Sequence, residues 1–157
     1  DNIEVGPSPS WVSNRLIALG MRPINNVVDA SNYVMLELGQ PSHTYDLDRV
    51  HGSGFKVRKA QEGEKITTLD GIERPLTSSD GVVADAKNVA IGIAGVMGGA
   101  STEIDQDTKT IALEMAWWDP ISISATARRL GLRSEASSRF ERGADPEIAD
   151  LFVGQLW

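Results

Sequence analysis

Two side chains in this sequence of 157 residues have types and settings that suit chemistry on a small ligand. His43 follows a Gly-Gln-Pro-Ser turn in "GQPSHTYD", where an imidazole is either the polar tip of a surface loop or a group held ready for a substrate. Glu114 lies in "TIALEMAWW", and strand alternation places it on one face with Ala112 and Ala116. That face either meets water or lines a pocket. In a pocket the carboxylate needs a partner, because an unpaired buried charge is costly.

Three further stretches contain residues that packing of a hydrophobic core does not explain. Arg22 follows a predicted helix end in "GMRPIN", where an arginine usually complements the helix dipole. The segment "GIAGVMGGA", residues 92–100, holds four glycines among apolar residues, which predicts either a bend in a sheet or a backbone that a ligand approaches. It lacks the G-x-G-x-x-G spacing of a dinucleotide site. The segment "LRSEASSRFERG", residues 132–143, places small side chains between charges and is typical of a polar loop, unless the small residues leave room for a ligand.

Composition narrows the chemistry. The chain has no cysteine, which excludes disulfides and thiolate metal sites, and it has only two histidines, which argues against a zinc site. Ser42 stands beside His43, but neighbours in sequence need not share a hydrogen bond, so no nucleophile and base pair is indicated. No apolar run approaches the roughly 18–20 residues that a membrane helix needs. A reducing cytoplasm fits this composition.

The elements that must position these groups can be predicted from local signals. Two amphipathic helices are expected near the start, one ending at Gly20 and one capped by Asn25 or Asn26 and closed by Gly39. A third helix is expected after Asp119, which is followed by proline. A last helix is expected over residues 145–152.

The middle of the chain has the patterns of strands. Alternation predicts a strand in "GFKVRKA", and the Asp-Gly pair in "KITTLDGIERPL" predicts a hairpin. Two more strands are expected around the turn "DAKN", and another in "TKTIALEMAWW". The predicted fold class is therefore α+β, with a strand-rich centre containing hairpins and amphipathic helices at both ends.

Length and charge bound the domain and its partners. The length fits a single domain over residues 1–157. Because the sequence has no initiator methionine and stops inside an apolar pattern, we expect it to be excised from something larger. The net charge of −7 argues against a protein that binds nucleic acid over its whole surface. Residues 128–142, however, carry five arginines and two glutamates, so this segment is either a solvated helix end or a patch that faces phosphate.

Three long blocks of the sequence resemble one family. "RPINNVVDASNYVMLELGQPSHTYD", "IAGVMGGASTEI" and "ALEMAWWDPISISATARRLGLRSEASSRFERGADP" are similar to the internal editing domain of the bacterial phenylalanyl-tRNA synthetase beta subunit. The resemblance runs from about Pro9 to Pro146. It implies an α+β module that hydrolyses tyrosine wrongly attached to the phenylalanine tRNA.

The resemblance also implies roles for particular residues. Its catalytic positions fall on His43 and Arg22. Its substrate-binding positions fall on Glu114, Ala94, Gly95, Ser134 and Ala136. Glu114 is expected to meet the tyrosine hydroxyl, Ala94 and Gly95 to let their backbone approach the substrate, and His43 to orient water or the tRNA end. No protein nucleophile is required, because a positioned water can attack the ester.

This chain departs from the family pattern at two places. The family commonly reads Met-His-Ala-Phe-Asp where this chain reads Ser-His-Thr-Tyr-Asp, over residues 42–46, and it usually has threonine where this chain has Ser134. Both changes keep polar groups at the site, so they bear on its detailed geometry rather than on whether it acts.

The resemblance extends to cofactors and partners. The chain itself is expected to need no cofactor or metal, since ATP and magnesium belong to the synthetic site elsewhere in the parent enzyme. Expected partners are the acceptor end of tRNA(Phe), the rest of the beta subunit and the alpha subunit of an α2β2 heterotetramer, in the cytoplasm and away from membranes. The alternatives are a non-catalytic module that binds tRNA or supports the subunit, and a free-standing deacylase, against which the apparently cut ends argue.

Overall fold

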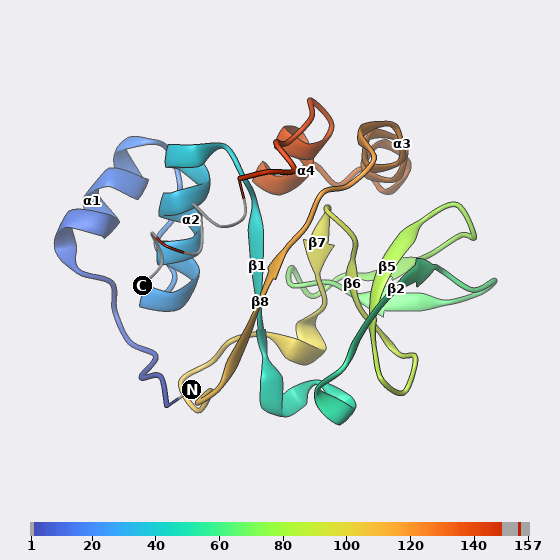
Figure 1. Ribbon diagram of the computed structural model, residues 1–157, viewed down its shortest axis with the longest axis horizontal. Helices are drawn as coiled ribbons and strands as arrows, with labels where there is room; N and C mark the ends of the chain where they lie inside the picture. The colour runs from blue at the N-terminus through green and yellow to red at the C-terminus, as the bar shows by residue number, and fades with distance from the viewer. Residues whose placement is uncertain (1, 149–153, 155–157) are drawn as a thin grey trace.

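The computed structural model describes residues 2–148 and residue 154 and has the predicted α+β class (Figure 1). The helices are α1 Ser10–Ala18, α2 Asn26–Leu38, α3 Pro120–Leu130 and α4 Glu135–Phe140. The strands are β1 Ser42–Asp46, β2 Phe55–Lys59, β3 Lys65–Thr67, β4 Glu73–Pro75, β5 Gly81–Asp85, β6 Ala90–Ile93, β7 Met97–Gly98 and β8 Ile111–Met115. None of the helices within this part of the chain is long and apolar enough to cross a membrane.

A central antiparallel ribbon, β1 with β8, separates two halves of the molecule (Figure 1). Helices α1 and α2 lie on one side of this ribbon. The sheet β2-β5-β6-β7 lies on the other side, with the β3–β4 hairpin beside it. Helices α3 and α4 lie together at the top of the view, over the end of the ribbon and the β6–β7 turn. Segments from both ends of the sequence therefore meet around the ribbon.

Local capping signals explain where two helices begin and end. The side-chain oxygen of Asn25 accepts hydrogen bonds from the backbone amides of Val27 at 3.1 Å and Val28 at 2.9 Å, so Asn25 caps α2. Gly39 ends α2 in the left-handed conformation, at φ 77°. Asp119 caps α3 through the amide of Ser122 in the same way. The hairpins at Asp70-Gly71 and at residues 85–88 also form as predicted.

Two predicted loops are regular structure. His43 lies on strand β1 rather than on a loop, because residues 42–46 pair with β8, a strand more than 60 residues further along the chain. The prediction was wrong because only this distant partner, and no local signal, makes the segment a strand. Residues 135–140 form α4 rather than a polar loop, since Ser134 supplies an N-cap.

The last predicted helix, over residues 145–152, finds no support in residues 145–148, which form a turn and irregular backbone. Residues 149–152 lie outside the described part of the chain.

Two clusters of buried apolar side chains fix the ribbon against its neighbours. The larger cluster packs the sheet against α3 and α4 and includes Val82, Ile93, Ile123 and Phe140. The smaller cluster packs the ribbon on the sheet and consists of Tyr45, Val50, Val83, Ile91 and Ala94. Burial of this apolar surface is the main force that holds the ribbon, and thus the face carrying His43, against the sheet.

Candidate active site

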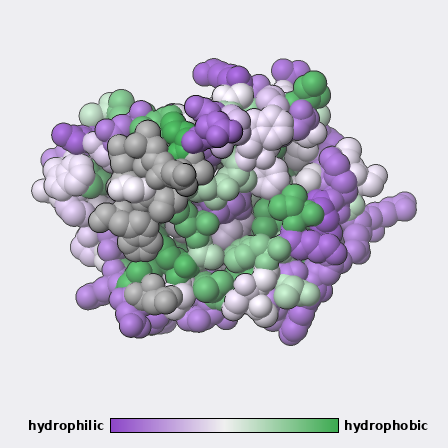
Figure 2. Space-filling model, viewed as in Figure 1, coloured by the Kyte–Doolittle hydropathy of each residue, from purple (hydrophilic) through white to green (hydrophobic). Residues whose placement is uncertain are grey.

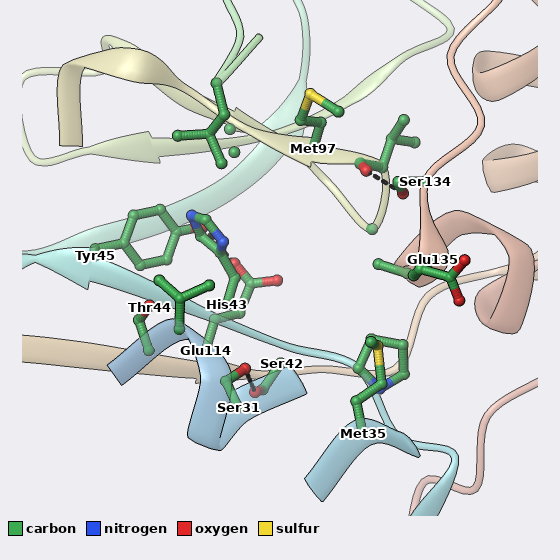
Figure 3. A pocket seen from close by; sticks show the side chains of 18 of the residues that line it. Ser31, Met35, Ser42, His43, Thr44, Tyr45, Met97, Glu114, Ser134 and Glu135 are labelled. Carbon is green, nitrogen blue, oxygen red and sulfur yellow. Dashed lines mark hydrogen bonds between the residues drawn. The ribbon is translucent and has the colours of Figure 1, made fainter. Parts of the chain in front are cut away.

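A cavity of about 350 Å³ lies where the ribbon, α2, the β6–β7 turn and α4 converge (Figure 3). Its volume falls within the usual range for small-molecule sites, roughly 300–1,000 Å³. On the face shown in Figure 2, hydrophobic residues gather along the middle of the molecule and hydrophilic ones surround them. Apolar lining residues such as Met35, Val96 and Met97 make most of the wall, and polar side chains enter at a few points.

The register of the ribbon brings His43 and Glu114 together. The two residues are direct cross-strand partners, so their side chains leave the same face of the antiparallel pair. Tyr45 is two residues beyond His43 and therefore shares that face, opposite the small side chain of Ala112. All three polar side chains line the cavity. The prediction that Glu114 and Ala112 lie on one strand face is thus consistent with the observed register.

Glu114 has a hydrogen-bond partner within the chain. The hydroxyl of Tyr45 donates a hydrogen bond to Oε2 of the Glu114 carboxylate. The Tyr45 ring meets the His43 ring edge to face, with centroids 4.5 Å apart and an interplanar angle of 88°. It packs on the other side against Phe55, at 5.1 Å. Tyr45 is therefore the partner that the buried Glu114 carboxylate requires. In the sequence, Tyr45 stood out only as a departure from the family pattern.

The surroundings set the protonation of this group of side chains. Burial raises the pKa of the Glu114 carboxyl, and the nearby Tyr45 and Trp118 side chains oppose that rise. Burial, together with the charge of Glu114, raises the pKa of Tyr45, so the phenol keeps its proton and acts as a donor. Burial lowers the pKa of His43 to about 4. At neutral pH the imidazole is therefore uncharged and has one nitrogen free to accept a proton or a hydrogen bond.

The glycine run both bends the chain and leaves room for His43. Gly95 adopts φ 67° in the β6–β7 turn, where a Cβ would come within 2.7 Å of Ile123 and 2.8 Å of Trp118. A Cβ on Gly98 would overlap the His43 imidazole. Gly98 was not among the predicted site residues, although it belongs to the segment that was flagged for its glycines.

Ala94 and Gly95 differ in their relation to the cavity. Gly95 lines it. Ala94 is buried in the smaller core cluster and is not one of the residues that line the cavity in the described part of the chain. Of this pair, Gly95 alone lines the cavity in the described part of the chain, and the role of its backbone stays a prediction.

Ser134 and Ala136 lie where α4 closes the cavity. Both residues line it. The hydroxyl of Ser134 donates to the carbonyl oxygen of Val96 at 2.6 Å and also accepts from the amide of Ser137 at 3.0 Å. Ser134 therefore ties the N-terminus of α4 to the β6–β7 turn, as the dashed bond in Figure 3 shows, and holds the cavity wall in place.

Arg22, like Ala94, is a predicted site residue that does not line the cavity. It is exposed in the segment between α1 and α2. Helix α2 instead contributes Ser31, whose hydroxyl lies 2.7 Å from that of Ser42. Sequence reasoning missed Ser31, since a serine on an amphipathic helix carries no local sign of a pocket.

Residues 2–148 and 154 contain no group of three or more acidic, histidine or cysteine side chains that could hold a metal ion.

Comparison with known proteins identifies the family. A family model described as the B3/4 domain matches residues 1–156. The "Phenylalanine--tRNA ligase beta subunit" of Carboxydothermus hydrogenoformans is 55% identical over 146 residues, covering 93% of this chain and 18% of that protein. The proteins of the same name from Nitratidesulfovibrio vulgaris and Streptococcus thermophilus are 55% and 53% identical, over 92% of the chain and 18% of their own length.

A solved N-terminal fragment of the phenylalanyl-tRNA synthetase beta subunit from Pyrococcus horikoshii aligns with 66% of this chain and 40% of its own. Its TM-score of 0.49 and identity of 14% are too low to support a functional conclusion. The chain thus spans 18% of the length of the bacterial relatives named above and is similar to them along nearly all of its own sequence. The chain belongs to the B3/4 domain family, in the form that phenylalanine–tRNA ligase beta subunits carry.

Proposed function

We propose that residues 1–157 are an editing domain that hydrolyses the ester joining tyrosine to tRNA(Phe). The observation that carries the proposal is the Glu114 carboxylate, which enters a largely apolar cavity beside the uncharged imidazole of His43. An apolar cavity accommodates the aromatic ring, and the carboxylate accepts a hydrogen bond from a substrate phenol. In this proposal His43 lies beside the ester that is cleaved.

Selectivity for tyrosine needs such a polar group. A pocket built for phenylalanine rejects an analogue that adds one hydroxyl by only about 10². A site that demands the hydroxyl discriminates more strongly, because phenylalanine would leave a buried polar group without its partner. One oxygen of Glu114 accepts from Tyr45. The proposal assigns the other oxygen to the substrate hydroxyl. The small side chain of Ala136 in the cavity wall leaves space for the aminoacyl group.

The hydrolysis itself requires only a positioned water. The water oxygen bonds to the ester carbonyl carbon, and the bond from that carbon to the ribose oxygen breaks. The proton lost by the water ends on the ribose oxygen, which releases free tyrosine and tRNA. Uncharged His43 can accept a hydrogen bond from the water and orient it. Because Arg22 is exposed outside the cavity, we assign it to the tRNA rather than to the reacting ester.

The family relationship extends the proposal to the parent enzyme. The domain would act within a longer beta subunit, joined to the alpha subunit in a cytoplasmic α2β2 enzyme, and would receive the acceptor end of tRNA(Phe). It would need no cofactor of its own, whereas ATP and magnesium would serve the synthetic site elsewhere.

One observation favours the alternative, a non-catalytic module that binds tRNA or supports the subunit. Glu114 is already paired with Tyr45, as a purely structural carboxylate would be. A deacylation assay separates the two. The enzyme that contains this chain should release tyrosine from tyrosyl-tRNA(Phe) much faster than phenylalanine from phenylalanyl-tRNA(Phe). If the enzyme still aminoacylates tRNA(Phe) but releases tyrosine and phenylalanine no faster than the esters hydrolyse without enzyme, the domain is not an editing domain.

A further inference from the structure

A second cavity adjoins the first one at α4. Its volume is about 470 Å³, and its lining is polar throughout: Arg133, Ser134, Glu135, Ser138, Arg139 and Arg142. We call this the arginine pocket. Ser134 and Glu135 line both cavities, so the two are neighbours across the start of α4. The two cavities therefore share part of their wall, and a ligand that extends past this wall can contact both.

Arg133 and Arg139, two of the three arginines, make ion pairs that a ligand can replace. Arg139 bonds to Glu135 at 2.7 Å, and the Glu135 side chain is 58% exposed. Arg133 lies 3.4 Å from Glu141, and its own side chain is 69% exposed. In each pair the other side chain is less exposed, Arg139 at 25% and Glu141 at 22%, but one partner reaches well into solvent, so the pair contributes only about 0–1 kcal/mol. Exchange of such a pair for an anionic ligand therefore has a small cost.

The pocket lies in a basic segment of an otherwise acidic chain. Residues 128–142 have a charge of +3, whereas the chain as a whole has −7, which leaves −10 for the remainder. A polyanion approaching the domain is repelled by most of the surface and attracted to this segment. Guanidinium groups form forked hydrogen bonds that match the oxygens of a phosphate, and the hydroxyl of Ser138 adds another donor in the same pocket.

We propose that the arginine pocket binds the phosphodiester next to the terminal nucleotide of the tRNA while the aminoacyl ester occupies the first cavity. The inference rests on the proposed function, since it takes the 3′ strand of the tRNA as the ligand. It gives the domain a second contact with the strand. This contact positions the ester relative to the first cavity. It does not depend on which amino acid is attached.

The test uses substrates with and without the phosphodiester. Arg142→Gln and Arg133→Gln are introduced into the intact enzyme, with Arg128→Gln as the matched control, because Arg128 is exposed in the same segment and lines neither cavity. Hydrolysis is measured on tyrosyl-tRNA(Phe) and on 3′-O-tyrosyl adenosine, which has no phosphodiester. We expect Arg142→Gln and Arg133→Gln to lower kcat/KM about tenfold on the tRNA ester, through KM, and to leave the nucleoside ester unchanged. Each should also make the salt dependence shallower by about 0.7 in log–log slope.

Binding of unreactive nucleotides tests the arginine pocket even if the enzyme hydrolyses neither ester. Wild-type enzyme should bind the trinucleotide cytidylyl-cytidylyl-adenosine more tightly than adenosine, and Arg142→Gln should remove that advantage while Arg128→Gln keeps it. Equal affinity for trinucleotide and adenosine in the wild type overturns the proposal, as does equal loss of hydrolysis on both esters. Failure of the wild type to hydrolyse tyrosyl-tRNA would instead refute the proposed function.

Discussion

The phenol of Tyr45 donates its hydrogen bond to the carboxylate of Glu114, so the chain places a tyrosine hydroxyl of its own on the group proposed to recognise a substrate tyrosine. The ribbon makes this contact possible. Residues diagonal to one another across an antiparallel pair are within reach when one side chain is aromatic and the other is long. Glu114 thus has one oxygen fixed by the protein, which orients the carboxylate toward the cavity.

Removal of the Tyr45 hydroxyl should weaken the site without unfolding it. In Tyr45→Phe the ring still packs against His43 and Phe55, but Glu114 loses a donor that favours its ionised form. The pKa of Glu114 should rise further. Because a hydrogen bond to a charged group contributes about 1.5–3 kcal/mol, hydrolysis of tyrosyl-tRNA near pH 7 should fall roughly tenfold. The acid limb of the kcat/KM profile should move to higher pH.

The matched control is Tyr33→Phe, which removes an exposed hydroxyl bonded to Arg15. It should leave both the rate and the pH profile unchanged. A Tyr45→Phe enzyme with the wild-type profile would show that Tyr45 only fills space beside Glu114.

Glu114→Gln should stabilise the folded chain as the pH rises. Burial raises the folded-state pKa of Glu114, so the contribution of this group to stability is complete below its unfolded-state pKa and is lost as the pH rises through the folded value. Glutamine avoids that loss and can still accept from Tyr45. The Tm of the variant should therefore gain on that of the wild type between pH 4.5 and pH 8, by a few degrees, since about 1 kcal/mol moves Tm by roughly 2–4 °C at this size.

Thermal unfolding across that pH range checks this expectation, with the exposed Glu62→Gln as control. A Tm difference between Glu114→Gln and the wild type that does not change with pH would mean that Glu114 is not a buried, perturbed carboxyl.

Gly98→Ala should displace His43. The backbone of Gly98 does not need glycine for its φ angle, so the substitution acts through its Cβ, which would overlap the imidazole. We expect hydrolysis of tyrosyl-tRNA to fall at least tenfold and Tm to fall by a few degrees, since overpacking costs about 1–3 kcal/mol, as measured by deacylation and thermal unfolding. Gly6→Ala, whose Cβ meets nothing within 4 Å, should preserve both quantities. Normal hydrolysis by Gly98→Ala would show that the position of His43 is not critical.

Ala136→Trp should close the cavity. Ala136 lines the cavity and packs against the larger core cluster, so a large side chain there either fills the substrate space or strains the wall. A folded variant should lose hydrolysis of tyrosyl-tRNA in the deacylation assay, whereas Ala18→Trp, on the exposed side of α1, should not. Full hydrolysis together with a normal melting curve would remove Ala136 from the site.

The part of the fold that local residues decide could be predicted from the sequence. Asn25 and Asp119 cap helices, Gly39 and Gly131 end them, and each acts on backbone within a few residues. Strand β1 was missed because residues 42–46 become a strand only by pairing with residues 111–115.

In the site, too, the residue types could be predicted from the sequence, whereas the contacts between distant segments could not. The chemical types of His43 and Glu114 were visible in the sequence, and the family resemblance placed them in one site. Their contact with Tyr45 depends on the register of two distant strands, which no local pattern reveals. Gly98 and Ser31 were missed for the same reason, since each matters only through a neighbour from another element.

The central claim is that Glu114 distinguishes tyrosine from phenylalanine. The measurement that tests it most directly is kcat/KM on tyrosyl-tRNA(Phe) and on phenylalanyl-tRNA(Phe), for the wild type and for Glu114→Ala, within the intact enzyme. Loss of the acceptor for a buried hydroxyl costs about 1–3 kcal/mol, so the preference for tyrosine should shrink by roughly one to two decades, through slower hydrolysis of the tyrosyl ester. An unchanged ratio between the two substrates would contradict the account and place the selectivity on other residues.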